Sequence, residues 1–435
     1  MVVLLFFSLA ARFFQIGYPP DVVFDEVHWG RYFSSYFTGN YYFDIHPPLG
    51  KLIYAGWAYC LGFDPSFVFE SGARYPGPWY IGLRALPSLV GAIIPVVIFF
   101  LGRGLGMKIA SAFIPAWMIA LDGALVEVSR FMLLDTFLLF FGFSAILAHQ
   151  QWLKDGRLWP LVLAGILCAF SFSIKWTGLT FLFLILLRQS FHLIVQKESS
   201  RDRASWAGLF VCLLLVPTIL YVSQFYLHFS LLTKSGLGDA FMSPAFQSTL
   251  SGNAFSLNPQ SVSPTFWEKF IEINRVMYSA SAGMTAGHPY GSVWYSWPLM
   301  LKPIYVWFGG VDKKIYMFGN PLIWWGSLVA ALASLQSTLI FRSSRWAPGV
   351  GLLLAGWTLN WLPFAEIKRV MFIYHYFPSL IFSMLLVGSL IDSIRRPTLP
   401  VLLIALLILC VSLYYSPISF GLAPPWPMLW MPSWT

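Results

Sequence analysis

The first candidates for chemistry are two adjacent carboxylates near the start of the chain. Asp25 and Glu26 stand in the stretch FDEVHWG, residues 24–30, between aromatic and aliphatic neighbours. Burial against apolar groups and a like-charged neighbour both raise the pKa of a carboxyl group, which improves it as a general base at neutral pH. Since adjacent side chains point apart, we expect one acid to accept a proton while the other orients a ligand. The simpler alternative is a pair of solvated turn residues.

A second polar cluster, DIHPPLGK at residues 44–51, follows after a short interval. Its His46, together with His28 and the two acids, could in principle ligate a metal ion. The spacing matches no metal-site motif, and lone histidines are more often hydrogen-bonded structural residues. We therefore expect no metal and no resident cofactor at this site.

Four cations occur where an apolar chain would not be expected to place them. Each stands at an end of an apolar segment that we assign to the outer membrane face: Arg84, Arg130, Lys175 and Arg369. Guanidinium and ammonium groups at one membrane depth could together neutralise a lipid phosphate. Alternatively, each one snorkels or pairs locally, as Arg130 could with Asp135. For the set, we favour phosphate binding.

The composition indicates a membrane protein with helical spans. The chain has 435 residues, of which 58% are hydrophobic, 18% are aromatic and only 10% are charged, whereas soluble domains are about 25% charged. Apolar stretches long enough for membrane helices predict about eleven spans in an all-α polytopic fold. The predicted spans are Val2–Ile16, Ala85–Gly102, Ile109–Leu121, Thr136–Leu153, Leu158–Ile174, Trp176–Val195, Ala204–Thr233, Ile315–Phe341, Trp346–Ala365, Val370–Ile391 and Pro397–Thr435.

The net charge of +9 is explained by membrane orientation rather than by a nucleic-acid partner. Cations gather in alternate short loops, which the positive-inside rule assigns to the cytoplasm. They are Arg103, Lys108, Lys154, Arg157, Arg188, Lys197, Arg201, Arg203, Arg342, Arg345, Arg395 and Arg396. Asp25 and Glu26 then face outward, at the periplasmic or lumenal surface.

We expect one domain, residues 1–435, with two large external segments at residues 17–79 and 230–314. The first span lacks a cleavage site and is expected to be a retained helix rather than a signal peptide. Pro47-Pro48 should open an interfacial helix over Leu49–Phe63. In the second segment, Ser263-Pro264 predicts a helix start. Its apolar face should contain Phe266, Phe270, Ile273 and Met277, which lie at helical spacing.

Seven blocks of sequence, in order along the chain, resemble the protein O-mannosyltransferase family of GT-C membrane glycosyltransferases. The blocks are FDEVHWG (24–30), DIHPPLGK (44–51), GLRALPSLVGA (82–92), SRFMLLDTFLLFF (129–141), SFSIKWTGL (171–179), HPYGSVWYSWPLML (288–301) and KRVMFIYHYFPSL (368–380). Eukaryotic members carry a hydrophilic β-trefoil (MIR) domain between spans seven and eight. The loop here is too short to hold it, which indicates a compact bacterial member.

The resemblance implies transfer of mannose from polyprenyl-phosphate mannose to Ser or Thr of secreted or membrane proteins, with inversion at the anomeric carbon. It implies Asp25 and Glu26 as the catalytic acids, with Asp25 as the base, and Arg84 as the residue that binds the donor phosphate. Lys175, Arg369, His46, Arg130, Asp135 and His288 complete the expected substrate site. The expected partners are the lipid donor, the bilayer and the acceptor polypeptide, with the secretion translocon as a candidate. The expected location is the bacterial inner membrane, or the endoplasmic reticulum in a eukaryote.

Two other functions remain open at this point. The first is a GT-C transferase that moves another lipid-linked sugar to a glycolipid. The second is a transporter or flippase, although transporters favour acids near mid-membrane and repeated halves, and neither feature is visible in the sequence. An assay with polyprenyl-phosphate mannose and a Ser/Thr-rich peptide separates all three.

The orientation can be tested by cysteine labelling in a background without the native cysteines. Cysteines at Ser200 and Ser344 should be protected from an impermeant external thiol reagent, because the positive-inside rule places both loops in the cytoplasm. A cysteine at Ser256 should react. The opposite labelling pattern would invert the topology and place Asp25 in the cytoplasm.

Overall fold

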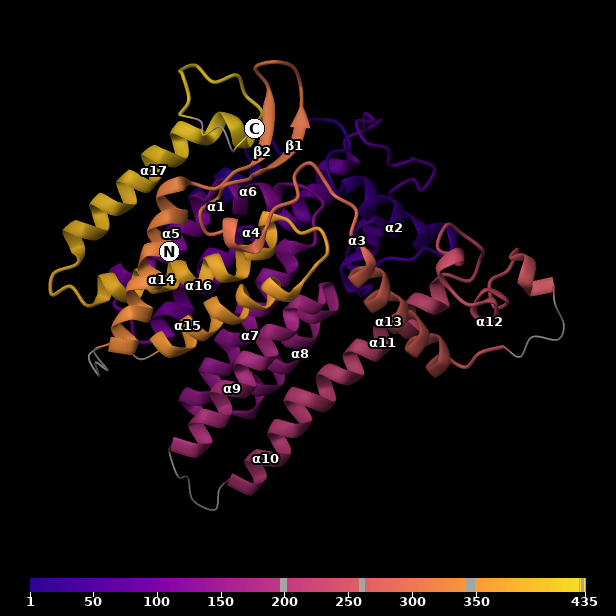
Figure 1. The fold of residues 1–435 in the computed structure, drawn as a ribbon, viewed down its shortest axis with the longest axis horizontal. Helices are drawn as coiled ribbons and strands as arrows, with labels where there is room; N and C mark the ends of the chain where they lie inside the picture. The colour runs from indigo at the N-terminus through magenta and orange to yellow at the C-terminus, as the bar shows by residue number, and fades with distance from the viewer. Residues whose placement is uncertain (196–201, 258–262, 341–348, 430, 432–433, 435) are drawn as a thin grey trace.

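The computed structural model describes residues 1–195, 202–257, 263–340, 349–429, 431 and 434. In this part of the chain the regular structure is helical except for one hairpin, β1 (Ile304–Phe308) and β2 (Lys314–Met317). The helices are α1 (Val2–Phe13), α2 (Glu26–Thr38), α3 (Leu49–Cys60), α4 (Trp79–Gly104), α5 (Ile109–Leu121), α6 (Gly123–Arg130), α7 (Asp135–Asp155), α8 (Leu158–Ile174), α9 (Leu179–Val195), α10 (Asp202–Phe210), α11 (Val216–Leu231), α12 (Pro244–Gln247), α13 (Phe266–Gly283), α14 (Pro321–Ile340), α15 (Val350–Leu359), α16 (Phe377–Asp392) and α17 (Thr398–Phe420). Figure 1 shows most of the helices packed in a bundle, with α12, α13 and the β1–β2 hairpin at its edges.

A helix occupies part of every stretch predicted to span the membrane. By length and apolar composition, five of the described helices can cross a bilayer, or six if the bent pair α5–α6 is one span. Helices α1 and α8 and the segment Trp176–Phe191 are apolar but shorter. The fold is that of a polytopic membrane protein, and the number of about eleven spans stays a prediction.

Three predicted boundaries were wrong. The stretch that begins at Ile315 opens in β2, and its helix starts only at Pro321. The stretch that begins at Val370 opens with a non-helical segment and a short 3-10 turn, so α16 starts at Phe377. The last stretch is helical only to Phe420. Absence of charge defined these stretches, but it does not distinguish a buried strand or loop from a membrane helix.

The predicted external helices are present, with one change at a helix start. Helix α3 covers most of the predicted interfacial segment. Helix α13 is capped by Thr265, whose side chain accepts a hydrogen bond from the Glu268 amide in a capping box, so the cap predicted at Ser263 was wrong. The four predicted apolar residues of α13 pack in one hydrophobic cluster together with Tyr41, Phe225 and Phe246.

Helices α5 and α6 meet at a bend of 55° that is stabilised by Asp122. One carboxylate oxygen caps α6 by accepting from the Leu125 amide at 3.1 Å. The other accepts from the Asn320 amide and from the Trp324 indole, both at 2.9 Å. This buried acid therefore ties the bend to the start of α14.

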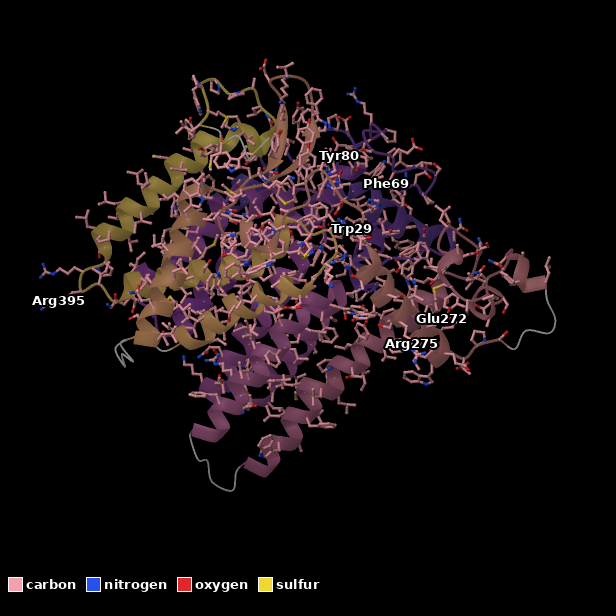
Figure 2. All side chains as sticks on the ribbon, in the orientation of Figure 1. Trp29, Phe69, Tyr80, Glu272, Arg275 and Arg395 are labelled. Atoms are coloured by element: carbon pink, nitrogen blue, oxygen red, sulfur yellow. The ribbon has the colours of Figure 1, made fainter. Side chains whose placement is uncertain are left out.

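The helices of the segments predicted to be external gather on one margin of the molecule. In Figure 1, α2, α3, α12 and α13 lie on the side opposite the connection between α16 and α17. Figure 2 places Arg395, a predicted cytoplasmic residue, at that far margin, and places Trp29 and Glu272 on the side of the external helices. Ser256 is exposed, whereas Ser200 and Ser344 lie outside the described residues.

Candidate functional site

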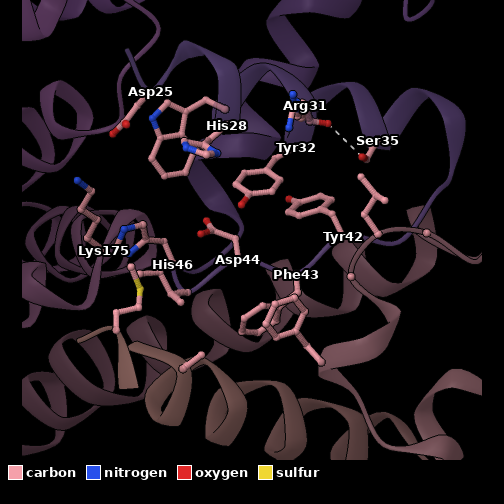
Figure 3. A pocket seen from close by; sticks show the side chains of 18 of the residues that line it. Asp25, His28, Arg31, Tyr32, Ser35, Tyr42, Phe43, Asp44, His46 and Lys175 are labelled. Atoms are coloured by element: carbon pink, nitrogen blue, oxygen red, sulfur yellow. Dashed lines mark hydrogen bonds between the residues drawn. The ribbon is translucent and has the colours of Figure 1, made fainter. Parts of the chain in front are cut away.

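A cavity of about 1190 Å³ is lined mostly by residues of the segments predicted to be external. Its wall is built from six parts of the chain, most of them far apart in sequence: residues 24–35, residues 40–46, Lys175, residues 235–241, residues 280–288 and residues 369–375. Figure 3 shows part of this wall, with Asp25, Lys175, His46 and Asp44 around a common space. The volume exceeds the roughly 300–1,000 Å³ of typical small-ligand pockets, so the cavity can hold a large ligand.

Two glycines allow the wall to close between residues 40–43 and the segment after α11. A Cβ atom on Gly236 would lie 2.2 Å from the carbonyl oxygen of Tyr41, and one on Gly238 would lie 2.3 Å from the amide nitrogen of Phe43. The Gly238 amide donates to the Tyr41 carbonyl at 3.2 Å. The two segments therefore approach backbone to backbone, which any side chain at these glycines would prevent.

Asp25 lines the cavity directly before the first turn of α2. Its carboxylate makes no capping hydrogen bond to the helix, and the preceding residue, Phe24, has a φ of 46°, a rare conformation for a residue other than glycine. Burial, with smaller contributions from Asp135 and Asp44, raises the pKa of Asp25 to about 6, although His28 and Lys175 oppose the shift. A carboxyl group with this pKa is suited to accept a proton near neutral pH.

Glu26 points away from the cavity and is fully buried. Its carboxylate accepts hydrogen bonds from the Val23 amide at 3.1 Å, the Tyr75 hydroxyl at 3.1 Å and the Met132 amide at 3.2 Å. The Arg84 side chain adds two more, each at 2.8 Å. The two adjacent acids thus point apart as expected, and Glu26 fixes the backbone from which Asp25 projects.

The role expected for Arg84 requires correction. Arg84 is fully buried and does not line the cavity. Besides its two bonds to Glu26, it donates to the Pro19 carbonyl at 2.7 Å and to the Asp21 carbonyl at 3.0 Å. The sequence placed this cation near the start of an apolar span, but position along a span does not reveal which way a side chain points. In this structure Arg84 braces the loop before α2 and does not present its guanidinium to a phosphate.

Two of the other predicted cations do line the cavity, Lys175 and Arg369. The Lys175 ammonium donates to both carboxylate oxygens of Asp135 at 2.8 Å and lies 4.8 Å from the Tyr374 ring centroid. Arg369 contacts the His375 ring nitrogen at 3.4 Å and forms no ion pair with an acid in the described chain. Of these two cations, Arg369 is therefore the one without an acidic partner among the described residues.

Arg130 lies elsewhere, and its suggested pairing with Asp135 was wrong. Its guanidinium donates to the carbonyls of Ser419, Phe14 and Gln15 at 2.9–3.0 Å. Asp135 pairs instead with Lys175. Neither Arg130 nor Asp135 lines the cavity. Arg130 joins residues 14–15 to Ser419, and Asp135 holds Lys175 in place.

The predicted histidines both lie at the cavity. Burial, followed by the charges of Lys175, Lys51 and Arg369, holds the pKa of His46 well below its usual range, so this imidazole is neutral. His288 packs its ring 5.1 Å from the Phe372 ring centroid and accepts from the Tyr290 amide at 3.1 Å. His28 also lines the cavity, and so do two residues that the sequence did not single out, His375 and Asp44.

Comparison with known proteins identifies the family. Residues 2–233 match the family model for dolichyl-phosphate-mannose-protein mannosyltransferase, and residues 266–434 match the C-terminal four-helix region of protein-O-mannosyltransferase. The chain is 35% identical over 258 residues to Protein O-mannosyl-transferase 1 of Danio rerio, covering 56% of this chain and 36% of the relative. It is 34% identical over 269 residues to Dolichyl-phosphate-mannose--protein mannosyltransferase 6 of Saccharomyces cerevisiae, covering 59% and 35%. It therefore spans about a third of the length of these curated relatives.

Solved structures share the fold. The chain superposes on a chain of the S. cerevisiae Pmt1-Pmt2 complex bound to the sugar donor with a TM-score of 0.89, at 20% identity, covering 100% of this chain and 92% of that one. ArnT from Cupriavidus metallidurans bound to undecaprenyl phosphate gives 0.55, at 17% identity, over 96% of this chain and 63% of that one. The fold is that of the GT-C membrane glycosyltransferases. More specifically, the chain belongs to the protein O-mannosyltransferase family.

Because Glu26 and Arg84 form a buried ion pair, we expect the losses of stability caused by substituting each of them to be coupled. Removing one partner of a buried ion pair costs about 3–5 kcal/mol, because the other charge is left uncompensated. Glu26→Gln and Arg84→Met should therefore each lower the unfolding midpoint of the purified protein in detergent. The double variant should lose less than the sum of the two single losses.

Arg130→Met provides the matched control, because Arg130 is buried but has no bond to Glu26. Its loss should add to that of Glu26→Gln. Strictly additive losses for Glu26→Gln and Arg84→Met would show that the two side chains do not stabilise each other as an ion pair.

Proposed function

We propose that this protein transfers mannose from polyprenyl-phosphate mannose to a Ser or Thr hydroxyl of a polypeptide. The observation that carries the proposal is the composition of one cavity. Asp25, a carboxylate with a raised pKa and no capping bond, shares that cavity with the cations Lys175 and Arg369. Membership of the protein O-mannosyltransferase family supports the choice of donor and acceptor.

The reaction is a single displacement at the anomeric carbon. Asp25 takes the proton from the acceptor hydroxyl, and the hydroxyl oxygen forms the new bond to the anomeric carbon. The bond from that carbon to the phosphate oxygen breaks, and the electron pair leaves with the polyprenyl phosphate. Attack opposite the leaving group inverts the configuration. The lipid-linked donor is the activated substrate, and the proposal requires no additional cofactor.

Lys175 and Arg369 are the groups proposed to hold the leaving phosphate. Two cations fixed near the developing charge stabilise it more than water does, because they require no reorganisation during the reaction. Asp135 keeps Lys175 in place through two hydrogen bonds. Arg369 remains available for bidentate contact with phosphate oxygens. The neutral imidazole of His46 shares the cavity with these cations and Asp25 without adding charge.

The site is proposed to face the outer side of the membrane, the periplasmic surface if the protein is bacterial. The distribution of loop cations supports this orientation. Acceptors would then be polypeptides that have crossed the membrane or are crossing it. The assay that tests the function uses purified protein, radiolabelled polyprenyl-phosphate mannose and a Ser/Thr-rich peptide. Label in a glycolipid instead of the peptide would favour the alternative transferase, and label in neither would refute the proposal.

Asp25→Asn should lower turnover at least about a hundredfold, because a positioned general base contributes about 10²–10⁴ to the rate. Binding of the donor lipid should persist, since the amide keeps the shape of the side chain. Asp64→Asn is the matched control, because this acid is exposed on the same external segment and bonds only to Ser66. Normal turnover by folded Asp25→Asn protein would remove Asp25 from the mechanism.

The pH dependence follows from the raised pKa of Asp25, which is about 6. Because the base must be ionised to accept a proton, kcat/KM should be constant above this pH and fall about tenfold per pH unit below it. If the base were an aspartate with an ordinary pKa, this fall in kcat/KM, the acid limb of the profile, would begin only at about pH 4. A profile of kcat/KM between pH 4 and 8 measures the limb, and constant activity down to pH 4.5 would contradict the assignment.

A further inference from the structure

Asp44 faces the same cavity, and the displacement described above gives it no part. Its carboxylate is buried, with 8% of the side chain exposed, and Oδ2 accepts from the Lys51 ammonium at 2.6 Å. Lys51 also donates to the carbonyls of His46 and Pro47, each at 2.7 Å. These three bonds use all three protons of the ammonium. The orientation of the Asp44 carboxylate is therefore fixed from one side.

The second oxygen of Asp44, Oδ1, accepts no hydrogen bond from any described residue. Figure 3 shows the carboxylate pointing into the cavity, with His46 on one side and Tyr32 on the other. Asp44 is also close enough to Asp25 and Tyr32 to contribute to the raised pKa of each, after the larger effect of burial. A charged acceptor so placed requires a hydrogen-bond donor from solvent or from a substrate.

The chemistry of the proposed substrates decides which of their groups can bond to Asp44. An ionised carboxylate only accepts hydrogen bonds, so it repels the donor phosphate, which Lys175 and Arg369 attract. The acceptor hydroxyl is engaged by Asp25. The remaining donors are the amides of the acceptor polypeptide and the hydroxyl groups of the sugar, and the sugar is the part that the proposed reaction holds at the reacting carbon beside Asp25. Aromatic side chains also line this cavity, among them Tyr32 and Tyr42, and such side chains suit the apolar face of a sugar ring.

We infer that Asp44 is a specificity-determining residue whose Oδ1 accepts a hydrogen bond from one hydroxyl of the sugar being transferred. This inference rests on the proposed function. Lys51 is then a positioning residue that holds the acceptor oxygen toward the sugar. A site built to bond a substrate hydroxyl discriminates strongly against an analogue that lacks it, because the buried polar group is left unpaired.

The experiment compares wild type and Asp44→Asn with polyprenyl-phosphate mannose and its four monodeoxy analogues, with one acceptor peptide. In Asp44→Asn the Lys51 ammonium selects the amide oxygen, so the amide NH₂ replaces the acceptor facing the cavity. Wild type should lose about 10- to 100-fold in kcat/KM with one deoxy donor, the range for a charged hydrogen bond. Asp44→Asn should lose a similar factor with mannose and almost nothing more with that deoxy donor.

Asp239→Asn is the matched control, because this buried carboxylate belongs to the neighbouring wall segment but bonds to Ser235, Gly236 and Asn253. It should affect all donors by one common factor. If Asp44→Asn does not fold, the double variant Asp44→Asn with Lys51→Gln removes both charges, and the same donor-specific pattern is expected of it.

Two results would overturn the inference while leaving the proposed function intact. One is a uniform loss by Asp44→Asn across all donors, which indicates a structural role. The other is a change confined to the KM of the peptide, which indicates that Asp44 binds the acceptor. Failure of wild type to transfer any of the sugars would refute the proposed function itself.

Discussion

The cavity depends on the buried ion pair between Glu26 and Arg84. Five donors converge on the Glu26 carboxylate from the loop before α2, from residues 75 and 84, and from the segment after α6. Most of the electrostatic attraction in such a pair offsets the cost of removing the charges from water. Its contribution here is geometric, because one carboxylate fixes three parts of the chain around the residue that precedes it, Asp25.

The same separation of tasks recurs around the cavity. Asp135 holds Lys175, and Lys51 holds Asp44, so in each pair one charge is a support and the other faces the cavity. A side chain supported in this way needs little reorganisation when a ligand arrives, which favours stabilisation of charge in a transition state. Arg369 differs, since its contact with His375 is long and involves no acid.

Much of this arrangement could be predicted from sequence. The apolar stretches located a helix in every expected place, and cations at their outer ends identified Lys175 and Arg369 as cavity residues. The direction of Arg84 could not be predicted, because residues near the same end of a span can face different sides of the helix. The Asp44–Lys51 pair carried a detectable signal, an acid and a lysine in one short polar stretch. The contact between residues 235–241 and residues 40–43, which are far apart in the chain, left no detectable signal in the sequence.

The contact between residues 235–241 and residues 40–43 determines when the cavity can form during synthesis of the chain. Gly236 and Gly238 join the end of the seventh predicted span to residues near the N-terminus, and Arg369 arrives later still in the chain. During synthesis the N-terminal third can form the Glu26–Arg84 pair, but the cavity stays open on two sides until the later segments dock. Nascent chains should therefore lack the closed cavity until insertion is nearly complete.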